Sequence, residues 1–347
     1  MTRADKAVLR VTIGLGAATL LAYGFALQAP FVVCVMATLV LCRPAPPLPL
    51  ARGVVLALVF GGLLTAGVLM VPVLEHHAFS GLLLTATILF AVFYVGQRRD
   101  HPLTTVLLLA FVLIPVVGVA EQAIIGALSL SLTLGILVGS LVNAISHALF
   151  PDEPVSRETT SPRPDADSVP AAWIAMRGTL IVMPVFVLAL TNPSLYVAAI
   201  MKTVALGQQA SHTTARDAGK ELVGSTLAGA AIGAAVWLGL SMWASLWMLT
   251  LWLMAAALWC ASALFGVRRT GVAPSFWSNA LITALILLGP AIEDSANGNS
   301  VVQASLVRTC LFVAVAGYAW VTVWALEQWR HWRRRATGAL APAAARH

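Results

Sequence analysis

Residues 30–42, PFVVCVMATLVLC, and residues 193–207, PSLYVAAIMKTVALG, set the expected fold of this chain. Each stretch begins at a proline that ends a longer apolar segment, and the two share a related core, MATLVL in the first and MKTVAL in the second. As helices of about 20 Å they are short for a hydrocarbon core about 30 Å thick. Short apolar segments at matching places predict a duplicated chain with a functional site near them.

The similarity between the two halves extends beyond these stretches. A basic residue follows each of them, Arg52 or Lys220, and small residues then recur every four positions. Small helix faces of this kind let transmembrane helices approach each other closely, so we expect these residues to pack against other helices. The small residues are Ala57, Gly61 and Thr65 in the first half and Ser225, Gly229 and Gly233 in the second.

The composition indicates a membrane protein. The chain has 347 residues, of which 59% are hydrophobic and 10% are charged, whereas soluble domains carry about 25% charged residues. Its net charge of +7 does not indicate nucleic acid binding, because the basic residues lie in short loops between apolar segments, where they set the topology. We therefore expect an all-α, polytopic protein whose main partner is the lipid bilayer.

Twelve apolar segments divide the chain. We expect a first membrane repeat at 1–150, a cytoplasmic linker at 151–170, a second membrane repeat at 171–330 and a cytoplasmic tail at 331–347. Most segments have the length of about 20 residues that a crossing needs. The twelve segments are 8–27, 30–42, 53–73, 79–96, 102–119, 123–149, 171–190, 193–207, 222–241, 243–265, 275–290 and 300–327.

The charges predict the orientation of these segments. If the N-terminus is cytoplasmic and every segment crosses once, nineteen of the 21 lysines and arginines fall on the cytoplasmic side. No basic residue falls in an outside loop, whereas Glu75, Glu121, Glu293 and Asp294 do. The positive-inside rule then predicts twelve crossings, both termini in the cytoplasm, and two parallel six-helix repeats related by an axis along the membrane normal.

Lys202 lies within an apolar segment, at the place that Ala37 occupies in the first half. A lysine at the centre of a transmembrane helix costs about 2.5–3.5 kcal/mol on insertion scales, so it is rarely without a function. Facing an internal cavity, its ammonium would attract a carboxylate, and we place Thr203 and Thr38 in the same substrate site. The alternative is that Lys202 snorkels to the cytoplasmic edge, close to Gly207.

Arg308 is the other basic residue that the charge count leaves outside the cytoplasmic side, and it lies near the outer end of the last apolar segment. It is a candidate substrate ligand. The alternative is a structural ion pair with a nearby acidic residue such as Glu293 or Asp294.

The sequence offers little for catalysis or cofactor binding. His147, with Asn143 one turn earlier, could carry protons, and the alternative is a satisfied helix end. No P-loop, HExxH, GxSxG or Cys/His zinc spacing occurs, and the four cysteines lie in apolar stretches. We therefore expect no enzyme activity, no cofactor and no metal site.

Residues 225–233 read STLAGAAIG and follow the basic residue Lys220. In this the chain resembles the fusaric acid resistance and aromatic acid exporter superfamily, whose members typically show an arginine and then Gly-Thr-x-x-Gly-x-x-x-Gly at the start of a transmembrane helix. Here Ser225 replaces the first glycine, and Lys220 stands further upstream than the usual arginine. The long members carry a cytoplasmic domain after each membrane half, so this chain looks like the short, membrane-only branch of unknown function.

The resemblance implies an efflux permease of the bacterial inner membrane, driven by the proton motive force and working with a periplasmic adaptor (membrane fusion) protein. With Lys202 as an anchor, its substrates would be small, anionic aromatic compounds. Two other hypotheses stay open. The first is a non-transporting scaffold that docks an adaptor or an envelope-assembly machine, and the second is an intramembrane enzyme. Self-association into a homo-oligomer also stays open.

The topology gives a first prediction. In a variant without native cysteines, a single cysteine at Ser80, Ala120 or Asn297 should react with an impermeant thiol reagent added to intact cells, because each site lies in an outside loop. A cysteine at Ser161 should react only after the cells are opened. Labelling of Ser161 in intact cells would contradict the predicted orientation.

Overall fold

The computed structural model describes residues 1–43, 50–99, 103–151, 171–210, 217, 219–298 and 300–344. Within these ranges the protein is helical and contains no strand, which confirms the predicted all-α class. The first half holds α1 (Arg3–Gly24), α2 (Pro30–Leu41), α3 (Leu50–Val68), α4 (Met70–His76), α5 (Ala78–Arg99), α6 (Leu103–Ala120) and α7 (Gln122–Leu149). The second half holds α8 (Ala171–Thr191), α9 (Pro193–Ala210), the π-helical turn η1 (Gly219–Gly224), α11 (Ser225–Met242), α12 (Leu246–Leu264), α13 (Pro274–Ala296) and α14 (Val301–Ala344).

The helices have the length and composition of a multi-pass membrane protein. In the described part of the chain, 9 helical stretches are long and apolar enough to cross a bilayer. Three shorter apolar helices accompany them, at Pro30–Leu41, Leu107–Ala120 and Leu195–Gln208. Each of the twelve segments expected from the sequence coincides with one of these helices.

Local sequence signals explain several of the helix boundaries. At the N-terminus of α1, the Thr2 side chain accepts a hydrogen bond from the Asp5 amide while the Asp5 carboxylate accepts one from the Thr2 amide, which is a capping box. Proline occupies the first turn of α2 (Pro30) and of α13 (Pro274), where a missing backbone N–H leaves no hydrogen bond unmade.

The core consists of four helices that are buried on nearly every side. In α2, residues 32–38 are all buried, and in α13 the buried run extends over residues 279–289. Much of α6 and α9 is equally enclosed. A helix that is apolar all round needs protein on every side, so α2, α6, α9 and α13 lie at the centre and the other helices surround them.

The packing partners recur between the two halves. In the first half α1 packs against α2 and α7, and in the second α8 packs against α9 and α14. Likewise α3 packs against α6, and α11 against α13. Between the halves, α1 contacts α12 and α5 contacts α8, while α2 contacts α13 and α6 contacts α9. Matching the helices in chain order pairs α1 with α8, α2 with α9, α3 with α11, α5 with α12, α6 with α13 and α7 with α14. Under this matching each of the contacts has a counterpart.

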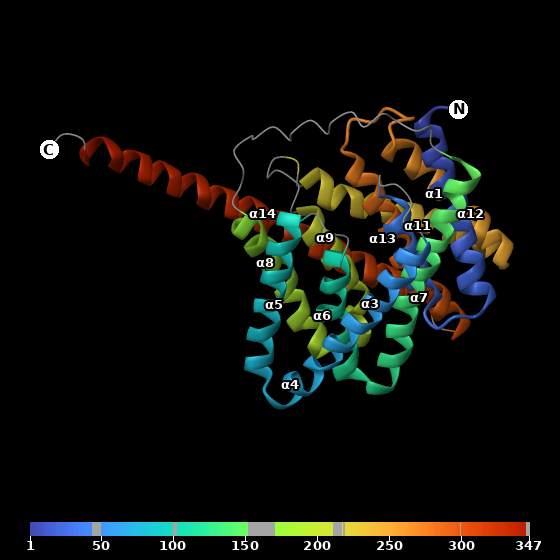
Figure 1. The fold of residues 1–347 in the computed structure, drawn as a ribbon, viewed down its shortest axis with the longest axis horizontal. Helices are drawn as coiled ribbons and strands as arrows, with labels where there is room; N and C mark the ends of the chain where they lie inside the picture. The colour runs from blue at the N-terminus through green and yellow to red at the C-terminus, as the bar shows by residue number, and fades with distance from the viewer. Residues whose placement is uncertain are drawn as a thin grey trace.

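The last helix is longer than the sequence indicated. We expected a segment that ends near residue 327 and a separate tail at 331–347, but α14 continues without a break from Val301 to Ala344. Its sequence contains no proline before Pro342, and its end is rich in alanine, the best helix former. Figure 1 shows α14, in red, running obliquely across the bundle and continuing well beyond it towards the C-terminus.

The small-residue faces are used unequally. Ser225, Gly229 and Gly233 are all buried on α11. On α3, Ala57 is buried and Gly61 is half-buried, but Thr65 is exposed, so the expectation that Thr65 packs against a helix is corrected.

The close contact at this end of α3 is made by Gly67 instead. A Cβ added to Gly67 would overlap the Ala110 carbonyl oxygen of α6. Thr65 lies two residues away from Gly67, and two residues correspond to about 200° around a helix, so it points away from that contact.

Gly229 gives a prediction for packing. A Cβ at this position would lie 2.5 Å from the Ala280 carbonyl oxygen and 2.5 Å from the Thr283 Cβ. Gly229→Ala should therefore lower the free energy of unfolding by about 1–3 kcal/mol, measured by thermal or denaturant unfolding in detergent. The matched control is Gly62→Ala, because Gly62 has nothing within 4 Å of its added Cβ. The control should be neutral or slightly stabilising, and equal effects at both positions would refute close packing of α11 on α13.

Candidate functional site

Lys202 is enclosed by protein in the middle of the bundle. The side chain lies on α9 and has 0% of its surface exposed. Its Nζ donates a hydrogen bond of 2.7 Å to Oγ1 of Thr283 on α13. The Thr283 hydroxyl in turn donates to the Asn279 carbonyl oxygen at 2.6 Å. The hydroxyl is thus oriented to accept from Lys202, and the two residues link α9 to α13.

The ammonium of Lys202 has more hydrogen-bonding capacity than the site uses. A lysine ammonium carries three N–H donors. Among the residues that the structure describes, Thr283 is the hydrogen-bond partner of Lys202, and no carboxylate forms an ion pair with it. A buried cation normally has a counter-ion, because its desolvation is costly. The site therefore has the chemistry to hold an anion.

The snorkelling alternative does not describe Lys202. A snorkelling lysine extends along its helix and exposes its ammonium at the membrane edge. Here the side chain is fully buried and reaches across to a neighbouring core helix. That alternative is therefore wrong.

The two threonines predicted for the site are buried but are satisfied within their own helices. The Thr203 hydroxyl donates to the Ala199 carbonyl oxygen at 2.6 Å, and the Thr38 hydroxyl donates to the Cys34 carbonyl oxygen at 2.8 Å. Each oxygen keeps lone pairs that can accept a further hydrogen bond. The structure shows no hydrogen bond between either threonine and Lys202, so the observed site is the Lys202–Thr283 pair.

The first half is tightly packed at the matching place, Ala37. Ala37 on α2 is fully buried, and α7 approaches it so closely that a Cβ added to Gly139 would lie 2.9 Å from the Ala37 Cα. A Cβ added to Gly135 of α7 would likewise lie 2.7 Å from the Met36 Cβ. Ala37 and its neighbour Met36 thus pack closely on α7, whereas the Lys202 side chain reaches from α9 to α13.

Arg308 is held by an ion pair away from this site. Its guanidinium pairs with the Asp294 carboxylate at 2.5 Å, where α13 ends and α14 begins. Both side chains are mostly buried, with 17% and 16% of their surfaces exposed. Arg308 therefore forms the structural ion pair that was the alternative to substrate binding. The structure does not bring Arg308 to Lys202.

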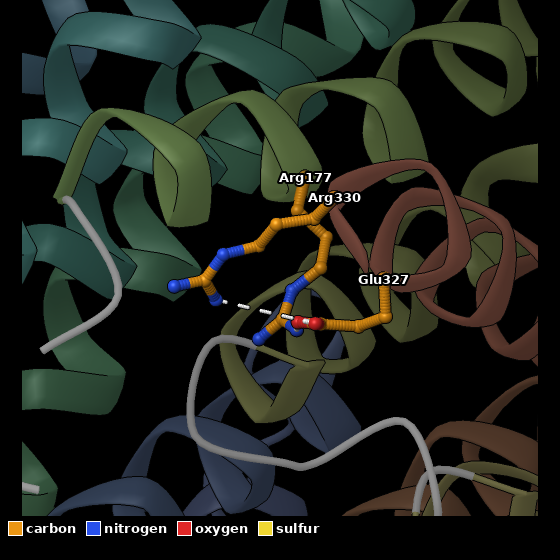
Figure 2. Close-up of polar contacts among 3 residues, drawn as sticks. All are labelled: Arg177, Glu327 and Arg330. Atoms are coloured by element: carbon orange, nitrogen blue, oxygen red, sulfur yellow. Dashed lines mark ion pairs between the residues drawn. The ribbon is translucent and has the colours of Figure 1, made fainter. Parts of the chain in front are cut away.

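A second charged cluster was missed by the sequence analysis. Arg177, one of the nineteen basic residues that the charge count assigns to the cytoplasmic side, is buried on α8, and its Nη1 lies 3.7 Å from Glu327 Oε1 on α14. Arg330, one turn further along α14, approaches the other oxygen of Glu327 at 4.0 Å. Figure 2 shows the guanidinium groups of both arginines converging on this one carboxylate. The position of Arg177 a few residues inside a transmembrane helix was the available signal.

The remaining candidates for chemistry stay isolated. His147 Nδ1 lies 2.9 Å from the Asn143 carbonyl oxygen one turn earlier, a contact within its own helix. In the described ranges, no group of three His, Cys, Asp or Glu side chains is arranged to hold a metal ion.

A largely apolar groove of about 280 Å³ lies between α11, α13 and α14, and its lining includes neither Lys202 nor Thr283. It is lined by small residues such as Gly233 and by larger ones such as Trp237 and Leu287. Gly233 lies one helical turn after Gly229 on α11, and Leu287 lies one turn after Thr283 on α13. One turn corresponds to about 6 Å along a helix, so this part of the groove lies about 6 Å from the Gly229–Thr283 contact. Its volume is close to the lower end for small-molecule pockets.

Comparison of the chain with models of known protein families finds no match, and neither does comparison with curated proteins or with solved structures.

The Lys202–Thr283 pair gives a prediction for stability. Thr283→Val keeps the side-chain volume but leaves the buried ammonium without its hydrogen bond, so the free energy of unfolding should fall by about 1–3 kcal/mol. In a Lys202→Met background the same change should cost much less, because no ammonium remains to be satisfied. Unfolding of the two single variants and the double variant in detergent measures this coupling. Additive effects would show that the hydrogen bond does not contribute.

Proposed function

We propose that the chain is a membrane transporter that exports small organic anions, with Lys202 as the group that binds the anionic end. The observation that carries this proposal is a fully buried lysine whose hydrogen-bond partner is a neutral hydroxyl. Ionisable groups inside membrane proteins are costly, and they mark substrate or ion pathways as a rule. A structural role alone would be served as well by an apolar side chain, as Ala37 serves in the first half.

We propose further that the halves 1–150 and 171–330 are parallel repeats, that the chain crosses the membrane twelve times, and that both termini are cytoplasmic. The recurrence of helix contacts in the two halves and across their interface supports a two-fold relation. The start of α1 and the point where α14 leaves the bundle both lie away from α4 in Figure 1, which supports this orientation together with the distribution of basic residues. Transport sites of repeat-built carriers lie where the repeats meet, and the core helices α2, α6, α9 and α13 make such contacts here.

The aromatic character of the substrate is inferred from two observations. The resemblance of residues 225–233 to aromatic acid exporters is the first. The groove beside Trp237 is the second, because it offers an apolar surface about one helical turn from Thr283. An aromatic acid offers an anionic group for an ammonium and a ring for an apolar surface. The periplasmic adaptor protein and the bacterial inner membrane are proposed on the resemblance alone.

The proton motive force can drive this export without a proton-carrying carboxylate in the site. When an anion leaves a cell whose interior is negative, its electrical free energy falls by about 2.3 kcal/mol per charge for each 100 mV of membrane potential. A fixed cation such as Lys202 lowers the barrier for an anion in the membrane interior. The membrane potential, which is the electrical part of the proton motive force, can therefore drive the export of an anion that binds at Lys202.

The scaffold hypothesis is favoured by one feature. α14 extends beyond the bundle (Figure 1), and its exposed side chains there include Trp332 and Arg333. Such an extension offers a surface for another protein. A scaffold has no need of Lys202, so the experiment below separates the two functions.

Export of a panel of aromatic acids from cells tests the proposal. Lys202→Ala should abolish export while the protein still inserts and accumulates, because the anion loses its anchor. Lys202→Arg should keep part of the activity, since the charge remains while its geometry changes. Expression of each variant is checked by immunoblot of the membrane fraction. Wild-type export by the alanine variant would end the anchor hypothesis and favour the scaffold.

A further inference from the structure

Residues 329–335 of α14, WRHWRRR, form a basic segment where the helix leaves the bundle. Four arginines fall within six residues, Arg330 and residues 333–335. The sequence contains no acidic residue after Glu327, and that carboxylate is already shared by Arg177 and Arg330. The basic segment therefore has a net positive charge.

The length of α14 places this segment at a membrane surface. Its apolar part, Val301–Arg330, has 30 residues, and a helix of that size is about 45 Å long against a hydrocarbon core of about 30 Å. Such a helix is accommodated by tilting, and Figure 1 shows α14 oblique to α5 and α8. A steeply tilted helix leaves the bilayer at a low angle, so the residues that follow its apolar part stay close to the lipid headgroups.

Aromatic contacts fix the start of the basic segment. The Trp329 ring packs against Trp173 of α8, with ring centroids 5.7 Å apart. The guanidinium of Arg333 lies over the same Trp329 ring, 4.2 Å from the ring centroid. Trp332 has 67% of its surface exposed. Exposed tryptophan next to arginine is the pattern of a membrane–water interface, where the indole lies at the headgroup level.

We propose that the basic segment 329–335 is a binding site for the headgroups of anionic phospholipids, in the leaflet where α14 leaves the bilayer. Arginine forms paired hydrogen bonds with phosphate oxygens and is weakly hydrated, which suits this interface. Clusters of basic residues directly after a transmembrane helix attract anionic lipid by charge. The bound lipid would hold the tilt of α14 and so maintain the contact of Glu327 with Arg177 on α8. This site is independent of the proposed transport function.

The thermal stability of the purified protein in neutral detergent tests this site. Added phosphatidylglycerol should raise the melting temperature more than added phosphatidylcholine does. In the variant Arg333→Gln, Arg334→Gln, Arg335→Gln the apparent affinity for phosphatidylglycerol should fall by about 100-fold, because each arginine near an anionic surface contributes about fivefold. The matched control removes three exposed basic residues elsewhere, Arg52→Gln, Lys220→Gln, Arg269→Gln, and should keep most of the affinity.

Two outcomes would overturn the proposal. The first is an equal loss of affinity in the basic-segment variant and in the control, which would show a general charge effect. The second is a stabilisation by inorganic phosphate as large as that by phosphatidylglycerol, which would show a site for free anions instead of lipid.

A second measurement on the wild-type protein does not depend on the variants folding. A phosphatidylglycerol analogue with a photoreactive group on its headgroup should label the peptide that contains the basic segment. Competition by unlabelled phosphatidylglycerol, and not by phosphatidylcholine, should reduce this label. Labelling confined to other peptides would refute the site.

Discussion

The burial of the Lys202 ammonium in the middle of a membrane-embedded bundle is the constraint on which the arrangement of the second half depends. Its Nζ donates a hydrogen bond to the Thr283 hydroxyl. Thr283 is held against α11 because Gly229 lets that helix approach it within van der Waals distance. A short helix, an inner hydroxyl and a glycine contact thus combine to keep one cation away from lipid, with donors left over for a ligand.

The two halves differ at the places of Ala37 and Lys202. Both halves use the same order of helices and the same kinds of contact. In the first half α7 packs closely on Met36 and Ala37 of α2 through Gly135 and Gly139. In the second half the long polar side chain of Lys202 reaches from α9 to α13. Of these two places, the second half alone carries an ionisable side chain, Lys202.

Local signals were sufficient to predict the helices, and long-range contacts were not predictable. Hydropathy and proline positions located the twelve apolar segments, including the short α2 and the place of Lys202, because both signals are properties of a few neighbouring residues. The partner Thr283 is 81 positions away from Lys202, and nothing in the local sequence indicates that the two helices meet. The positive-inside rule assigns Arg177 to the cytoplasmic side from its charge alone. Its burial is possible because Glu327, 150 positions away in the sequence, forms an ion pair with it.

Binding of benzoate to the purified protein, measured by isothermal titration calorimetry, tests the central role of Lys202 most directly. The wild-type protein should show saturable binding. Lys202→Met, which keeps the length of an unbranched side chain and removes the charge, should bind about ten- to a hundredfold more weakly, the effect of losing a charge-assisted hydrogen bond. Its melting temperature should stay at or above that of the wild type, because a buried charge has been removed. Equal affinity in the two proteins would contradict the assignment of Lys202 as the anion-binding group.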